Sequence, residues 1–229
     1  MVNEDAKENG IRRAAEHERA TEAAYRIRID DDPSCIDATA WDGLVNAQPS
    51  ANPFVRHAFL TALHASGSAC HATGWRPQFV TLYREEELVA ACPLYGKSHS
   101  YGEYVFDWAW ADAYQRHGLN YYPKLLGAVP FTPVPGPRLI ANSPAHRLLL
   151  LQALAGVAQE AGLSSVHLLF VDDADRQAVE QVIQAAPATD ASPGWMLRSN
   201  VQFHWHNRSP EAWPDFTAFL ADLQREKRK

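Results

Sequence analysis

The stretch SPAHRLLLLQALAGVAQEAGLSSVHLLFVDDADRQAVEQVI, residues 143–183, decides the class of the fold. Ser143-Pro144 is a typical helix start and Gly162 a typical stop. Five apolar side chains between them share one helical stripe: Leu148, Leu151, Leu154, Val157 and Ala161. The apolar run 165–171 predicts a buried strand, and the acidic residues 172–175 open a second helix. Helix, strand and helix in this order are typical of α/β proteins.

Upstream of this stretch, the alternating residues 25–29 predict a strand, and helices are expected over 36–45 and after Asn52-Pro53. The β-rich runs 77–83 and 88–94 flank an Arg-Glu-Glu-Glu turn and predict a hairpin. We therefore expect an α/β fold whose central mixed (α+β) sheet is mostly antiparallel, with helices on both faces.

Downstream, residues 195–206 predict one or two strands that carry Gln202, His204 and His206 on the face opposite three apolar side chains. Asp215 could cap a last helix with an apolar stripe. That helix has no stop signal before Lys229, so we expect the chain to end inside a helix.

Composition limits the classes of function. The chain has 229 residues, of which 46% are hydrophobic, so it can bury a core. A formal charge of −6 argues against DNA binding by global charge. No apolar run is long enough to span a membrane, and the charged start does not resemble a secretory signal. Three cysteines without a CxxC pair fit a reducing compartment, so we expect a cytoplasmic protein.

Residues 97–138 differ from the rest because aromatic and ionisable residues interleave there without a regular period. If residues 99–114 form a helix, His99, Glu103 and Asp107 lie on one face. Neighbouring carboxylates and an imidazole suit general acid–base catalysis, because their interaction and partial burial can shift a pKa toward neutrality. The alternative is an ordinary solvated helix face.

Lysine usage points to the same segment. The chain has 16 arginines but only five lysines, and Lys97 and Lys124 are the two inside the expected domain. We expect them, with Arg138, to bind anionic parts of a substrate, unless they are ordinary surface lysines. Tyr101, Tyr121 and Tyr122 would pack against the substrate or serve as an acid.

Other chemistries have weaker support. His204 and His206 share a strand face and, with His99, could hold the metal of a metal-dependent hydrolase, but a hydrogen-bonded histidine pair fits the pattern better, so no metal site is assigned. His167 is expected to be a core histidine. No GxSxG nucleophile elbow and no GxxxxGK[ST] or GxGxxG phosphate loop occurs.

Several strings make the chain resemble a FemAB-like family: Thr73-Gly74-Trp75-Arg76-Pro77, Pro93-Leu94-Tyr95, residues 97–108, 121–125, 130–134, 136–139, 164–167, 202–207 and 227–229. The family is placed in the GNAT acyltransferase superfamily and labelled as peptidoglycan biosynthesis or recognition. Its Fem-type relatives have two GNAT-like halves and transfer an amino acid from charged tRNA to a cell-wall precursor amine, whereas ordinary GNAT enzymes use acyl-CoA. The resemblance thus implies a GNAT-like fold.

The resemblance also implies a domain layout. Residues 25–208 would be a GNAT-like domain, and 209–229 the start of a linker helix toward a missing second half. For residues 1–24, the many charged residues and the lack of aromatic ones predict a flexible charged tail. The GNAT pyrophosphate signature [RQ]xxGx[GA] is not found, so the sequence offers no motif for acyl-CoA binding by this half.

Two functions follow from these expectations. In the first, the domain belongs to an acyl or aminoacyl transferase that acts on the amine of a small-molecule or peptide acceptor, with acyl-CoA or aminoacyl-tRNA as donor. Glu103 or Asp107 would then take the amine proton, directly or through a water. In the second, the domain is a non-catalytic module that binds a peptide, a muropeptide or a protein partner. The sequence leaves the oligomeric state open.

Overall fold

The computed structural model describes residues 25–185, 194–199, 201–203, 206–207 and 209–227. The expected tail over residues 1–24 lies outside these residues. The chain divides into two compact units at the boundary between Trp195 and Met196, and each unit is described by itself. This boundary falls within the expected domain over residues 25–208.

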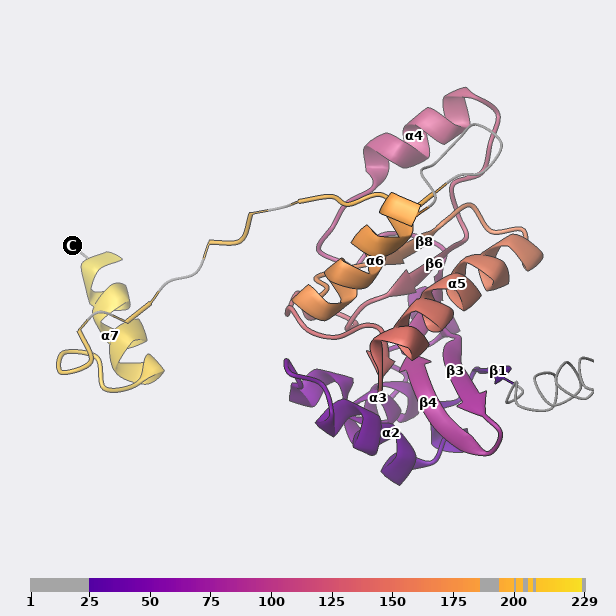
Figure 1. Cartoon of the computed structure of the whole chain (residues 1–229). Helices are drawn as coiled ribbons and strands as arrows, with labels where there is room; N and C mark the ends of the chain where they lie inside the picture. The colour runs from indigo at the N-terminus through magenta and orange to yellow at the C-terminus, as the bar shows by residue number, and fades with distance from the viewer. Residues whose placement is uncertain (1–24, 186–193, 200, 204–205, 208, 228–229) are drawn as a thin grey trace, which may run out of the picture. The chain divides into compact units, whose positions relative to one another are not determined.

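The first unit is a mixed α/β structure, as the sequence predicts (Figure 1). Its elements in chain order are β1 (Tyr25–Asp30), η1 (Pro33–Cys35), α2 (Ala38–Asn46), η2 (Pro53–Val55), α3 (His57–Ala65), η3 (His71–Thr73), β2 (Trp75–Pro77), β3 (Phe79–Arg84), β4 (Glu87–Cys92), β5 (Leu94–Lys97), α4 (Trp108–Arg116), β6 (Lys124–Gly127), β7 (Ile140–Ala141), α5 (Pro144–Glu160), β8 (Val166–Leu168) and α6 (Asp173–Ala185).

The strands form two four-stranded sheets, ordered β1-β3-β4-β7 and β2-β5-β6-β8. The predicted hairpin is confirmed, and it links the two sheets because β2 continues into β3 and β4 into β5. The strand register does not shift between the two sheets, because Pro77 pairs with Tyr95 in one sheet and Val80 with Cys92 in the other. Between these pairs, the Gln78 amide donates to the Leu94 carbonyl over 2.8 Å. All pairs of these strands are antiparallel except β6 with β8.

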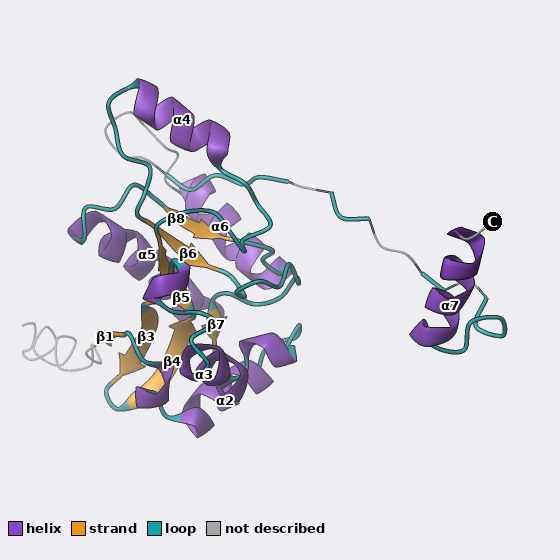
Figure 2. Ribbon diagram, turned by 180° about the vertical axis from the view of Figure 1, so that it is seen from behind, coloured by secondary structure: helices purple, strands orange, loops and turns teal. Residues whose placement is uncertain are grey.

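Helices pack against the strands from both faces, and Figure 2 shows them from behind. One apolar cluster joins α2 and α3 to the strands through Trp41, Leu44, Leu60, Phe79 and Ala91. A second cluster joins α5 and α6 to the strands through Val80, Val89, Leu150, Leu154 and Val179. Neighbouring residues such as Phe79 and Val80 enter opposite clusters because side chains alternate across a strand. Each fully buried leucine contributes about 1.5–3 kcal/mol relative to an exposed one.

Helix α5 begins and ends where the sequence predicts. The Ser143 hydroxyl accepts a hydrogen bond from the His146 amide over 3.2 Å, which satisfies one free donor of the first turn. Gly162 adopts a left-handed φ of +63°, and the Leu163 amide then donates to the Ala158 carbonyl over 2.9 Å. This end fixes where the chain turns back into β8.

The second unit differs from the sequence prediction in one respect. The described residues between 195 and 206 contain no strand, so the predicted strand is wrong for them. Val201 and Phe203 are 78% and 97% exposed, and an alternating pattern without a partner strand gains no ladder of hydrogen bonds. The predicted last helix is confirmed as α7 (Phe216–Lys227), capped by Asp215, whose carboxylate accepts from the Ala218 amide over 2.8 Å. None of the helices in the part of the chain that the structure describes is long and apolar enough to cross a membrane.

Candidate functional site

The helix predicted over residues 99–114 starts only at Trp108, so the predicted stripe of His99, Glu103 and Asp107 is wrong. Residues 98–107 form a loop in which Gly102 and Tyr104 have φ values of +80° and +59°. A right-handed helix cannot accommodate these angles. Glu103 and Asp107 nevertheless come together, because both contact Lys124 at the start of β6.

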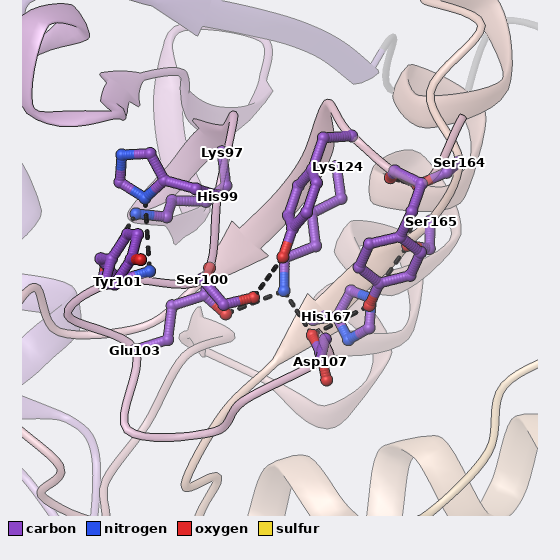
Figure 3. A network of polar contacts seen from close by, with 12 residues as sticks. Lys97, His99, Ser100, Tyr101, Glu103, Asp107, Lys124, Ser164, Ser165 and His167 are labelled. Carbon is purple, nitrogen blue, oxygen red and sulfur yellow. Dashed lines mark hydrogen bonds and ion pairs between the residues drawn. The ribbon is translucent and has the colours of Figure 1, made fainter. Parts of the chain in front are cut away.

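Three side chains form what we call the lysine–carboxylate cluster: Lys124 of β6, Glu103 and Asp107. The Lys124 ammonium donates to Glu103 Oε2 over 2.8 Å and to Asp107 Oδ2 over 2.5 Å, as Figure 3 shows. At most 1% of each side chain is exposed. The anionic partners of Lys124 are therefore the chain's own carboxylates. A buried charge is costly unless it is paired in this way.

Lys97 lies beside this cluster because β5 and β6 place Lys97 directly opposite Lys124. The Lys97 ammonium is buried 3.6 Å above the centre of the Trp75 ring and donates to the Tyr101 carbonyl over 3.2 Å. Burial lowers the pKa of Lys97 to about 7; Glu103 opposes this shift and Lys124 adds to it. Near neutral pH, Lys97 can therefore either hold or release a proton.

The two carboxylates of the cluster have different proton affinities. Burial raises the pKa of Glu103 despite the pairing with Lys124, and Glu103 Oε1 is buried without a hydrogen-bond partner among the described residues. Burial also acts to raise the pKa of Asp107, but hydrogen bonds from Lys124 and Tyr121 outweigh it, so that the net shift is downward. In acid–base sites, the pKa values of two neighbouring groups are typically shifted apart, so that one can exchange a proton near neutral pH while the other stays ionised.

Tyr121 extends the polar network away from the cluster. Its hydroxyl donates to Asp107 Oδ2 over 2.9 Å and lies 3.2 Å from His167 Nε2, which is 2.8 Å from the Ser165 hydroxyl. Burial and then the hydrogen bond to Asp107 raise the pKa of Tyr121, so the phenol keeps its proton. His167 is therefore not only a core residue, since it joins the cluster to the start of β8.

The surface near the cluster is rich in aromatic side chains. Five of them are between 44% and 66% exposed, and we call them the aromatic surface: Tyr101, Tyr104, Phe106, Trp108 and Trp110. The rings of Phe106 and Trp108 contact each other with centroids 5.0 Å apart. Helix α4 buries none of its residues, and both views place it at one end of the first unit (Figures 1 and 2). Exposed aromatics gathered in one segment indicate a surface for binding.

Several predicted site residues lie near the cluster without joining it. The His99 ring contacts Tyr101, with ring centroids 5.1 Å apart, and burial followed by the charge of Lys97 lowers the pKa of His99. The hydroxyl of Tyr122 lies 2.5 Å from that of Ser100. The structure thus gathers His99, Tyr101 and Tyr122 around the loop that carries Glu103.

Arg138 does not reach this site. Its side chain is fully buried, and its guanidinium donates to the carbonyls of Leu169, Pro137 and Val134 over 2.8, 3.1 and 2.6 Å. These bonds hold the segment after β6 against the segment after β8. Arg138 is therefore part of the scaffold, and it is not included in the proposed substrate contacts.

The remaining predicted residues belong to the second unit. Gln202 and His206 are exposed there, and His204 lies outside the described residues. Among the residues that the structure describes, no group of three histidine, cysteine or acidic side chains is placed to hold a metal ion.

Sequence reasoning missed Trp75, whose ring covers Lys97, and the link from Tyr121 through His167 to Ser165. Trp75 and Lys97 are cross-strand partners in the register of β2 and β5. An alternating pattern identifies each strand but does not give the register between strands, so these contacts leave no signal in one sequence.

Comparison with known proteins identifies the family. A FemAB-like family model, described as peptidoglycan biosynthesis/recognition, matches residues 33–229. The chain belongs to the FemAB-like family. No curated protein and no solved structure matches. The match spans nearly the whole FemAB-like chain, including the loop that carries Glu103 and Asp107. Its description names both biosynthesis and recognition, so the choice between transfer and binding depends on the site.

Proposed function

We propose that this FemAB-like protein transfers an acyl or aminoacyl group to the amine of a peptidoglycan-type peptide, with Glu103 as the general base. The observation that carries the proposal is the contrast within the lysine–carboxylate cluster. Glu103 has a raised pKa and one free oxygen, whereas Asp107 stays ionised and holds Lys124. A base must take a proton near neutral pH, and Glu103 is the better suited of the two.

In the proposed reaction, the acceptor amine attacks the carbonyl carbon of the donor. A C–N bond forms, and the C–S bond of an acyl-CoA or the ester C–O bond of an aminoacyl-tRNA breaks. The amine proton passes to Glu103 Oε1, directly or through one water, and then to the leaving thiolate or alkoxide. Lys124 and Asp107 fix the position of Glu103, and Lys97 offers a charge beside it.

The order of elements supports a GNAT-like domain for this reaction. One strand and two helices precede an antiparallel hairpin, and α5 then connects the parallel strands β6 and β8. The FemAB-like match supports a peptidoglycan-type acceptor. Donor identity is a matter for experiment, because acyl-CoA and aminoacyl-tRNA satisfy the same chemistry.

The test is transfer of radiolabel from [¹⁴C]acetyl-CoA or [¹⁴C]alanyl-tRNA to a lysine-containing muropeptide by the purified chain. The matched control is Glu86→Gln, since Glu86 lies in the hairpin turn with its side chain 97% exposed. We expect transfer from at least one donor, and we expect Glu103→Gln to lower its rate about 10²–10⁴-fold while Glu86→Gln leaves it unchanged. Circular dichroism verifies that both variants fold. A folded Glu103→Gln protein with the parent's rate contradicts the proposal.

A second function, binding of a muropeptide without transfer, is favoured by the aromatic surface. In that case the parent binds the muropeptide, Trp108→Ala weakens binding, and no label is transferred from either donor. Leu119→Ala is the control, because Leu119 is 59% exposed just beyond α4. Tryptophan fluorescence or calorimetry measures the affinity.

A further inference from the structure

A pocket of about 380 Å³ opens beside β2 and β5. Arg76 of β2 and Gln78, just after β2, line it on one side, and Gly96 of β5 lines it on the other. Their neighbours Trp75 and Lys97 pair on the opposite face of the same strands, because successive side chains alternate. Lys97 and Ser98 also line the pocket, so it adjoins the lysine–carboxylate cluster, but Glu103, Asp107 and Lys124 are not among its lining residues.

The charge of the pocket is positive. Its lining includes Arg76, Lys97 and His71 but neither an aspartate nor a glutamate, although the whole chain carries a formal charge of −6. Within the residues that the structure describes, the exposed Arg76 side chain makes no hydrogen bond or ion pair. A guanidinium with free donors beside a hollow is suited to a carboxylate or a phosphate, which it can bind through two parallel hydrogen bonds.

The shape of the pocket indicates an organic ligand. Gly96 forms part of its floor, directly opposite Arg76 in the strand register, and has no side chain to fill the space. Tyr122, Pro123 and Leu163 provide an apolar wall. A volume of about 380 Å³ falls in the range of small-molecule sites, about 300–1,000 Å³, and exceeds what a bare phosphate needs.

We propose that this pocket binds an organic oxyanion, with Arg76 pairing the charged group and the wall at Tyr122 and Leu163 contacting its carbon skeleton. The charged group is the carboxylate of a peptide or the phosphate of a nucleotide. The inference goes beyond the proposed transfer reaction and does not depend on it, because binding can be measured without a donor.

The test is calorimetric titration of two probes into the purified chain: N-acetyl-alanyl-alanine as a peptide carboxylate and ADP as an organic phosphate. Arg76→Ala removes the pairing cation. Arg84→Ala is the matched control, because it removes the same charge from the far end of the same hairpin. Gly96→Val fills the floor. A Cβ at Gly96 lies 3.8 Å from the nearest Arg76 atom, which is an ordinary contact, so the strand tolerates a side chain there.

We expect at least one probe to bind, and we expect Arg76→Ala and Gly96→Val each to weaken binding at least tenfold while Arg84→Ala changes it less than twofold. The probe that binds identifies the source of the oxyanion. Absence of binding by both probes overturns the inference, as does equal weakening by Arg76→Ala and Arg84→Ala. If the protein shows no transfer activity but binds a probe through Arg76, the proposed reaction is rejected and the inference about this pocket still holds.

Discussion

Replacing Lys124 with methionine tests whether the lysine–carboxylate cluster is held together by a single buried cation. The Lys124 ammonium contacts Glu103 and Asp107 at 2.8 and 2.5 Å, and at most 1% of any of the three side chains is exposed. Methionine fills a similar volume but brings no charge. The variant therefore leaves two buried carboxylates, and among the described residues Asp107 keeps a further donor, the Tyr121 hydroxyl.

The expected loss follows from the cost of an unpaired buried charge. Removing one partner of a buried ion pair costs about 3–5 kcal/mol, and here both carboxylates lose the same cation. We expect the free energy of unfolding at pH 7 to fall by about that amount, which lowers the melting temperature by roughly 6–20 °C for a unit of this size. The deficit shrinks at pH 4.5, because the unpaired carboxylates bind protons in the folded state.

Urea denaturation followed by circular dichroism measures this loss. Two controls accompany it. Adding Glu103→Gln and Asp107→Asn to Lys124→Met removes the unpaired charges and is expected to restore more than half of the lost stability. Arg26→Met breaks an exposed ion pair with Glu86, 3.7 Å long, and should cost less than about 1 kcal/mol. A Lys124→Met loss no larger than that of Arg26→Met would show that the cluster is not buried as described.

Three further predictions use the same urea assay. Gly102→Ala places a Cβ 2.7 Å from an aromatic ring at a residue with a φ of +80°. The control is Gly118→Ala, because Gly118 has a similar φ of +71° but open space around it. We expect Gly102→Ala to destabilise the protein by about 1–3 kcal/mol more than the control, and equal losses would contradict the close packing at Gly102. Asp175→Ala removes the acceptor of two backbone amides and the partner of a buried arginine, so we expect a loss of about 3 kcal/mol. Asp173→Ala, 87% exposed, should change stability by less than about 0.5 kcal/mol. The folded-state pKa of Lys97, about 7, lies below its ordinary value of 10.5. Between these two values the unfolded chain holds a proton that folded Lys97 has released, so the free energy of unfolding falls as the pH is lowered from 10.5 to about 7. The stability of Lys97→Met relative to the parent should therefore increase from pH 10 to pH 7, and a difference independent of pH would contradict the assignment.

The elements of the fold were largely predictable because their signals are local. Helix α5 follows from an apolar stripe at helical spacing between Ser143 and Gly162, and the hairpin follows from two β-rich runs around a charged turn. The strand predicted over 195–206 failed in the described residues because alternation alone does not supply a neighbouring strand. Polar and apolar side chains alternate in extended chains as well.

The site was predictable in its location but not in its geometry. A change in composition and the scarcity of lysine singled out Lys97, Lys124, Glu103 and Asp107. The i, i+4 spacing suggested a helix there, but the left-handed Gly102 turns that segment into a loop. The partners of Lys124 lie 17 and 21 residues away and are brought together by the path of that loop and the register of β6. Such non-local pairing is not encoded in a periodic pattern.

The measurement that most directly tests the account is the titration of the two carboxyl groups by ¹³C NMR. The protein is labelled at its aspartate and glutamate carboxyls, and Glu103→Gln and Asp107→Asn assign the two signals. We predict that Glu103 titrates above its ordinary value of 4.5 and Asp107 below its ordinary value of 3.8. Glu103 titrating at or below 4.5, or Asp107 titrating above Glu103, would contradict the division of roles between base and anchor.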